Sequence, residues 1–162
     1  MKTTFILGGC RSGKSRHGLE LAEKISDRGR IFIATCVPHD QEMKDRVANH
    51  QKERGRDWIT IEAPIRAPDA ILENSGKAEI ILVDCLTLWN SNILLDPDEA
   101  ENIDKHLNDL MNALKKAKCP IILVSNEVGT GIVPENALAR QFRDMVGKTN
   151  QTVAKYAERL IW

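Results

Sequence analysis

Residues 4–15 read TFILGGCRSGKS, and this stretch determines the fold class that the sequence predicts. Residues 8–15 match the pattern G-x-x-x-x-G-K-[ST], with an apolar, strand-like run before them and a helical stretch after them. Such a loop turns its backbone N–H groups toward phosphate oxygens, and the helix N-terminus adds a positive dipole end. Lys14 is expected to reach the β- and γ-phosphates, and the Ser15 hydroxyl to hold Mg²⁺. A glycine-rich turn with an exposed lysine is the alternative, which the agreement of motif and context disfavours.

Length and composition exclude several classes of protein. The chain has 162 residues, of which 42% are hydrophobic, and its 23 basic and 23 acidic residues give zero net charge. This length suits a single domain, residues 1–162, with a sizeable core. The charge balance argues against a nucleic-acid binder, and the mixed charges with normal apolar content argue against disorder. The longest apolar runs are too short for membrane insertion, and four scattered cysteines without an export signal favour the cytoplasm.

Short apolar runs alternate with longer amphipathic stretches, which is typical of an α/β protein with a mostly parallel sheet. Four strands are expected, at residues 4–7, 31–35, 80–83 and 121–124. They end in polar residues or glycine, namely Gly8, Thr35, Asp84 and Ser125. Because parallel strands end at one edge of the sheet and ligands bind outside that edge, these residues mark a candidate site.

The helices are predicted from apolar periodicity and capping residues. Asp96 and Pro97 are expected to begin a helix whose apolar stripe runs from Ile103 to Ala117. Further stripes between residues 138 and 160 indicate two helices, which Gly147 is expected to separate.

Asp84 ends the apolar run 80–83 and has two readings. It resembles the strand-end carboxylate that engages Mg²⁺ in nucleotide-binding proteins, and it also suits the N-cap of a helix beginning near Leu86. The two roles are compatible. Together with the loop, Asp84 predicts that the chain binds a purine nucleoside triphosphate and Mg²⁺, without distinguishing a kinase from a switch, a motor or a nucleotidyltransferase.

The segment 40–54 is expected to be helical, with His50 on the same face as Met43 and Val47. Spacing alone favours a buried core histidine. The functional alternative is a nucleophile, because Arg46 and Arg54 lie four residues before and after His50. These arginines would keep the imidazole neutral at neutral pH and would also bind triphosphate oxygens.

Taken together, the motifs identify a family resemblance. The chain resembles the bifunctional adenosylcobinamide kinase/adenosylcobinamide-phosphate guanylyltransferases of cobalamin biosynthesis over nearly its whole length. The matching blocks are residues 8–17 (GGCRSGKSRH), 33–35 (IAT), Glu42-Met43, Arg46, His50, Trp58, Thr60, Glu62, 83–89 (VDCLTLW), Ser91-Asn92, 125–134 (SNEVGTGIVP), Ala139-Arg140, 142–144 (FRD), Gly147 and Asn150-Gln151. The loop motif is generic, whereas the later blocks are specific to the family.

The resemblance implies a P-loop NTPase fold, a RecA-like three-layer sandwich, and two reactions. A nucleoside triphosphate first phosphorylates adenosylcobinamide, and GTP then donates GMP to that phosphate through a guanylylated histidine, here His50. Lys14 would assist catalysis, with Ser15 and Asp84 holding Mg²⁺. The nucleotide-binding residues are expected to be Gly8, Gly9, Cys10, Arg11, Ser12, Gly13, Lys14, Ser15, Ala34, Thr35, Cys36, Gln51, Lys52, Glu53, Arg54, Glu62 and Asp84. Glu62 is either a guanine-binding carboxylate or a solvated strand end.

The resemblance also implies GTP, ATP and adenosylcobinamide as substrates, and a homotrimer. Two features depart from the family pattern. Cys10 stands where the family more often has alanine, and the chain ends at Trp162, where the family continues into one more short strand, so this last strand is expected to be missing. A kinase for another small alcohol and a non-catalytic nucleotide switch are the alternatives, and the block 126–134 weighs against both.

Overall fold

The computed structural model describes residues 3–38, 41 and 57–162. Its centre is a six-stranded sheet in the order β3-β2-β4-β5-β1-β6, and every neighbouring pair of strands is parallel. The strands are β1 (Thr3–Gly8), β2 (Arg30–Ala34), β3 (Trp58–Glu62), β4 (Ile80–Asp84), β5 (Ile121–Asn126) and β6 (Arg159–Ile161). The described helices are α1 (Lys14–Ile25), α3 (Ala67–Asn74), α4 (Leu86–Leu95), α5 (Ile103–Lys116) and α6 (Ala137–Tyr156).

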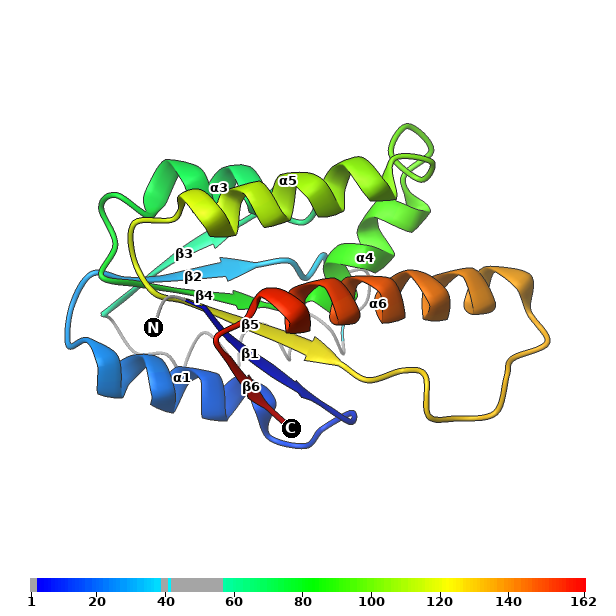
Figure 1. Cartoon of the computed structure of the whole chain (residues 1–162), viewed down its shortest axis with the longest axis horizontal. Coiled ribbons are helices and arrows are strands. Elements are labelled where there is room, and N and C mark those ends of the chain that lie inside the picture. Colours follow the sequence, from blue (N-terminus) through cyan, green and yellow to red (C-terminus); the bar gives the residue numbers. More distant parts are fainter. Residues whose placement is uncertain (1–2, 39–40, 42–56) are drawn as a thin grey trace.

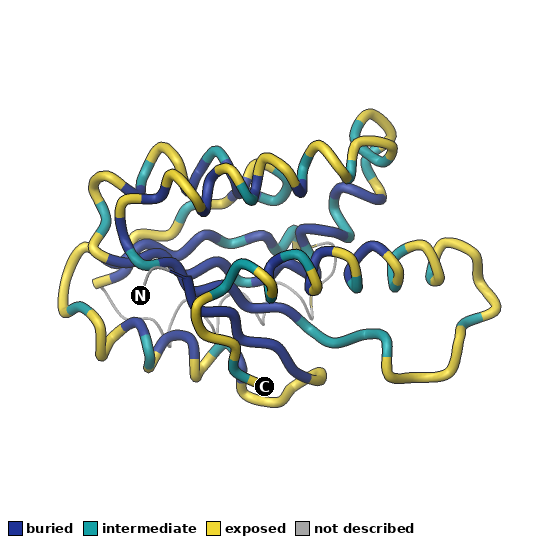
Figure 2. The backbone as a smooth tube through the Cα atoms, in the orientation of Figure 1, coloured by how far each residue is buried: buried dark blue, intermediate teal, exposed yellow. Residues whose placement is uncertain are grey.

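Helices cover both faces of the sheet, which makes three layers (Figure 1). Helices α3, α4, α5 and α6 lie over one face, and α1 lies over the other. Successive strand residues therefore enter different cores: Phe5 and Leu7 pack beneath α3–α6, whereas Ile6 packs with Leu19 of α1. Figure 2 shows that the central strands β1, β2, β4 and β5 are almost entirely buried, as expected for a parallel sheet covered on both sides, whereas the edge strands β3 and β6 are partly exposed. The predicted fold class is confirmed.

All four predicted strands are present, and the sheet contains two more. Strand β3 pairs with β2, and β6 pairs with β1 through Thr4 to Ile6. The helical stripe predicted to reach residue 160 is therefore wrong at its end, because Arg159–Ile161 extend along β1 as a strand. The chain can do this since α6 ends at Tyr156 and Glu158 donates its backbone N–H to the Thr3 carbonyl, at 3.1 Å.

Two helix predictions are corrected. Asp96 follows the end of α4, and its carboxylate accepts the Asp98 N–H at 3.0 Å, which forms a local turn; α5 begins only at Ile103, where the apolar stripe starts. Gly147 does not separate two helices, because α6 is continuous, with Val146 and Thr149 buried on either side of it.

The helix predicted over residues 40–54 lies outside the described residues. Among the residues that are described, no helix is long and apolar enough to span a bilayer.

Two glycines of this fold predict opposite effects on stability. A Cβ at Gly18 of α1 would lie 3.1 Å from Leu82 Cδ1 and 3.5 Å from Val124 Cγ2, whereas a Cβ at Gly147 would meet nothing within 4 Å. We expect Gly18→Val to lower the free energy of unfolding by about 1–3 kcal/mol through overpacking. Gly147→Ala should raise it by about 0.5–1 kcal/mol, because alanine loses less backbone entropy in a helix. Urea denaturation of both variants measures this, and a Gly18→Val variant as stable as the parent would contradict the close packing of α1.

Candidate nucleotide site

The carboxyl ends of the strands meet at one edge of the sheet, as the sequence predicted. Across this edge Ala34 is in register with Glu62 on one side and with Asp84 on the other. Further along the sheet, Gly8 is in register with Asn126. Asp84 is in register with Val124, so β5 and β1 reach two residues beyond it, to Asn126 and Gly8. These strand ends therefore lie along one edge of the sheet, although they are far apart in sequence.

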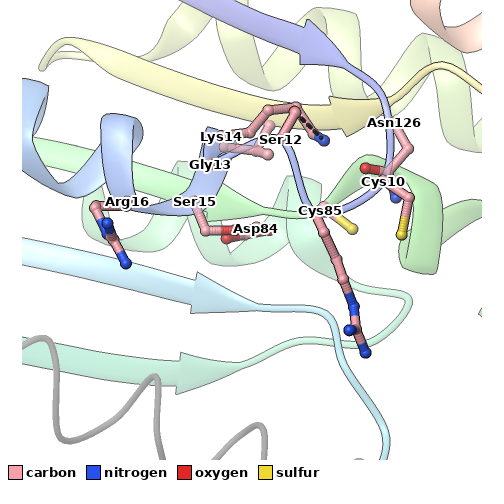
Figure 3. Close-up of a pocket in the computed structure, with 11 residues that line it drawn as sticks. Cys10, Ser12, Gly13, Lys14, Ser15, Arg16, Asp84, Cys85 and Asn126 are labelled. Carbon is pink, nitrogen blue, oxygen red and sulfur yellow. Dashed lines mark hydrogen bonds between the residues drawn. The ribbon is translucent and has the colours of Figure 1, made fainter.

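The loop between β1 and α1 encloses one side of a pocket of about 650 Å³ at this edge (Figure 3). Gly13 is the N-cap of α1 and has φ of 88°, a left-handed conformation that favours glycine. The volume lies within the ordinary range for small-ligand sites. The residues lining the pocket are Cys10, Arg11, Ser12, Gly13, Lys14, Ser15, Arg16, Asp84, Cys85, Val124 and Asn126.

Lys14 is the buried cation of this pocket. Its residue surface is only 9% exposed, and its ammonium group donates hydrogen bonds to the Gly9 carbonyl and to Ser12 Oγ, the latter at 3.3 Å. Burial lowers the pKa of Lys14, and the Asp84 carboxylate opposes this by favouring the charged form. A phosphate in the pocket would favour the ammonium further. The site therefore holds a positive charge whose neighbours in the protein compensate it only in part.

Ser15 and Asp84 form a pair of oxygen ligands that fits a divalent cation. Both side chains line the pocket, and Figure 3 shows them pointing toward one another from α1 and β4. Among the described residues there is no group of three or more His, Cys, Asp or Glu side chains that would hold a metal without a substrate. A cation held by one or two protein oxygens completes its shell with phosphates and water.

The hydroxyl of Thr35, predicted to lie in the nucleotide site, is engaged within the protein. It donates to the Cys85 carbonyl at 2.7 Å and accepts the Cys85 N–H at 2.8 Å, and Thr35 is fully buried. Asn92 holds the Thr35 carbonyl in turn, at 2.7 Å. Thr35 therefore fixes the backbone after β4. Its neighbours Ala34 and Cys36 are partly exposed at the end of β2.

Glu62 is exposed at the end of β3, two strands away from Asp84. Its position suits either reading from the sequence, so the contact with guanine stays a prediction. The other predicted residues, His50, Gln51, Lys52, Glu53 and Arg54, lie outside the described residues.

Four residues that line the pocket were not among the predicted site residues: Arg16, Cys85, Val124 and Asn126. Cys85 and Asn126 had a detectable signal, because each lies at or directly after the end of a predicted strand. The loop motif itself covers only residues 8–15, and it carries no information about which other strand ends come close to it.

Comparison with known proteins identifies the family of this chain. Residues 4–162 match the model of a family described as cobinamide kinase / cobinamide phosphate guanyltransferase. The chain belongs to this family. The resemblance inferred from the sequence is thereby confirmed, and the family is one of bifunctional enzymes of adenosylcobalamin biosynthesis.

Individual relatives extend over most of the chain. The bifunctional adenosylcobalamin biosynthesis protein CobP of Pseudomonas aeruginosa is 39% identical over 159 residues, covering 96% of this chain and 89% of that protein. The corresponding CobU protein of Escherichia coli K12 is 36% identical over 171 residues, covering 98% and 92%. Among solved structures, the RadB recombinase aligns over 85% of this chain and 70% of its own, with 16% identity and a TM-score of 0.43.

The thiols of the pocket are expected to differ in reactivity. Cys10 is exposed on the loop, whereas Cys85 is buried, and burial together with Asp84 raises the pKa of Cys85 to about 12. At pH 7.5 the folded protein should react with iodoacetamide at Cys10 and not at Cys85, because only the thiolate is nucleophilic and Cys85 stays a thiol until strongly alkaline pH. Peptide mass spectrometry measures this. All four cysteines should react in denaturant, and equal labelling of Cys10 and Cys85 in the folded protein would contradict the prediction.

Proposed function

We propose that this chain carries out two successive transfers at the pocket described above. In the first, a nucleoside triphosphate, ATP or GTP, donates its γ-phosphoryl group to the hydroxyl of adenosylcobinamide. In the second, GTP donates GMP to the resulting phosphate, which gives adenosylcobinamide-GDP and pyrophosphate. The observation that carries the proposal is the loop whose buried Lys14 shares a pocket with Asp84 at the strand edge, in a chain that belongs to the kinase/guanyltransferase family.

The phosphate half of the site is supported by the described residues. The backbone N–H groups at the start of α1 and the Lys14 ammonium provide fixed positive potential for the β- and γ-phosphates. Ser15 and Asp84 would hold Mg²⁺, which would neutralise part of the phosphate charge. Lys14 stabilises the departing phosphate oxygens in both reactions, since the leaving group is a polyphosphate each time.

The guanylyl transfer uses His50 as its nucleophile in this proposal. A neutral imidazole nitrogen attacks the α-phosphorus of GTP, a P–N bond forms, and the bond to the β-phosphate oxygen breaks to release pyrophosphate. An oxygen of the cobinamide phosphate then attacks the same phosphorus, and the P–N bond breaks to restore the histidine. Glu62 would accept hydrogen bonds from the guanine N1–H and amino groups, and residues 51–54 would contact the nucleotide.

The remaining predictions concern the oligomeric state, the cellular location and the partners of the protein. The resemblance implies a homotrimer, and the scattered cysteines without an export signal favour the cytoplasm; both stay predictions. Zero net charge gives no support for a nucleic-acid partner.

Covalent trapping tests the transferase half. Incubation with GTP labelled at the α-phosphate should give acid-labile, alkali-stable label on the protein, and GTP labelled at the γ-phosphate should give none. His50→Ala should abolish the label, because no other nitrogen takes the place of its imidazole. Failure of the parent protein to take up α-label would refute the histidine intermediate.

The kinase half requires a separate measurement. His50→Ala should keep phosphorylation of adenosylcobinamide from γ-labelled ATP, whereas Lys14→Ala should reduce both transfers by about 100-fold or more, as loss of a preorganised charge contact does. Gly147→Ala, at a residue that does not line the pocket and where an added Cβ meets nothing within 4 Å, serves as the control and should change neither. A kinase that ignores adenosylcobinamide but accepts another small alcohol would favour the alternative substrate class.

A further inference from the structure

The side chain of Asn126 is a polar group of the pocket that the proposed chemistry does not yet use. Asn126 is the last residue of β5, and the register places it directly beside Gly8, where the phosphate-binding loop begins. It lines the pocket, and Figure 3 shows its amide extending into the space beside Cys10. Within the part of the chain that the structure describes, no residue is hydrogen-bonded to this amide, whereas both of its backbone polar groups are bonded.

The backbone of Asn126 is held from two sides. Thr87 Oγ1 of α4 accepts the Asn126 N–H at 2.7 Å, and Asn150 Nδ2 of α6 donates to the Asn126 carbonyl at 3.1 Å. The Thr87 hydroxyl also lies 3.2 Å from Ser125 Oγ. Thr87, Ser125 and Asn150 are all at most 5% exposed, so these bonds are shielded from water. The Asn126 backbone is thus fixed, while its side-chain amide has no hydrogen-bond partner among the described residues. This is the arrangement expected of a preorganised ligand contact.

The place of Asn126 indicates which part of a nucleotide it would meet. The loop passes from Gly8, beside Asn126, to Ser15 and Arg16 at the start of α1, so Asn126 lies at the end of the pocket where the loop begins. The Lys14 ammonium bends back to the Gly9 carbonyl and so lies toward that same end. Because this lysine contacts the β- and γ-phosphates in such loops, the Asn126 amide faces the end of the pocket that these outer phosphates would occupy.

We propose that Asn126 donates an Nδ2–H hydrogen bond to an oxygen of the terminal phosphate of the bound triphosphate, and that Thr87 is its positioning residue. This inference rests on the proposed function, because it requires a triphosphate in the loop. A neutral amide suits the position because it can bind a phosphate oxygen. A second cationic side chain there would compete with Lys14 for the Asp84 carboxylate. Asn126 then contacts the group transferred in the kinase reaction and the outer phosphate of the pyrophosphate released in the guanylyl transfer, and it distinguishes triphosphate from diphosphate.

Nucleotide affinity tests the role of Asn126 without depending on turnover. GTP and GDP dissociation constants are measured by calorimetry with Mg²⁺, in a His50→Ala background that cannot become guanylylated. Asn126→Ala should weaken GTP binding by about 10- to 100-fold, the usual loss for a hydrogen bond to a charged group, and should change GDP binding by less than about threefold. Asn126→Asp, which has nearly the same shape, should weaken GTP binding further because its carboxylate repels the phosphate.

The matched control is Asn74→Ala, because Asn74 lies at the end of α3, outside the pocket lining, and its side-chain amide donates to the Ala70 carbonyl. It should change neither affinity. Equal weakening of GTP and GDP in Asn126→Ala, no weakening of either, or a parent protein that binds both equally would each overturn the proposal. Loss of α-label from the parent protein, in contrast, refutes the His50 step while leaving the GTP and GDP comparison intact.

Two variants of Thr87 separate positioning from general stability. Thr87→Val leaves the buried Asn126 N–H without its acceptor, so it should reduce the preference for GTP over GDP, whereas Thr87→Ser keeps the hydroxyl and should restore it. Thermal melting records whether each variant is folded, and Thr152→Val, which removes a hydroxyl on α6 bonded to the Lys148 carbonyl, is the control. Val and Ser variants with the same nucleotide preference would refute the role of Thr87.

Discussion

The parallel pairing of β1, β5, β4 and β2 is the constraint on which the rest of the molecule depends. Each of these strands is buried on both faces, so its central positions accept only apolar side chains, and Phe5 or Val83 replaced by a polar residue would have no partner. Polar chemistry is therefore confined to the strand ends. Because all strands run in the same direction, those ends meet at one edge, and the loop after β1 closes over them.

The buried ammonium of Lys14 links this architecture to phosphate chemistry. A buried cation costs free energy unless it is paired, and here the partners are a carbonyl, a hydroxyl and the nearby Asp84 carboxylate. These groups hold Lys14 in place without neutralising it fully. The overall charge of the chain is zero, so attraction for the proposed triphosphate would come from this local arrangement and from the start of α1 rather than from a basic surface.

Strands and helices could be predicted from the sequence where a local signal, such as an apolar run or a capping residue, agrees with how the segment packs in the protein. Four strands are continuous apolar runs and were found; β3 was missed because it is an edge strand whose Ile59 is 62% exposed, and β6 because it has only three residues. Asp96 has the chemistry of an N-cap, but the apolar stripe that stabilises a helix begins only at Ile103. Gly147 carries a helix-breaking propensity that the buried residues around it override.

The site could be predicted where a motif has a fixed spacing and not where it depends on how strand ends pack. Lys14, Ser15 and Asp84 follow from the motif and from a strand end. Thr35 was predicted to lie in the nucleotide site, and its hydroxyl bonds to the Cys85 backbone; Asn126, which lines the pocket, was not among the predicted site residues. Spacing along the chain does not show that the Thr35 side chain turns inward while Asn126 lines the pocket. These orientations depend on how neighbouring strand ends pack against each other.

The same device fixes both strand ends beside the loop. Regular ladder hydrogen bonds stop where β4 and β5 end, and a buried threonine hydroxyl replaces them at each: Thr35 binds the backbone of Cys85, and Thr87 binds the backbone of Asn126. Asn150 extends this series to α6. Such shielded bonds keep irregular backbone satisfied and rigid. The edge of the sheet can therefore present Asp84 and Asn126 to a ligand from fixed positions, although neither belongs to the loop that binds the phosphates.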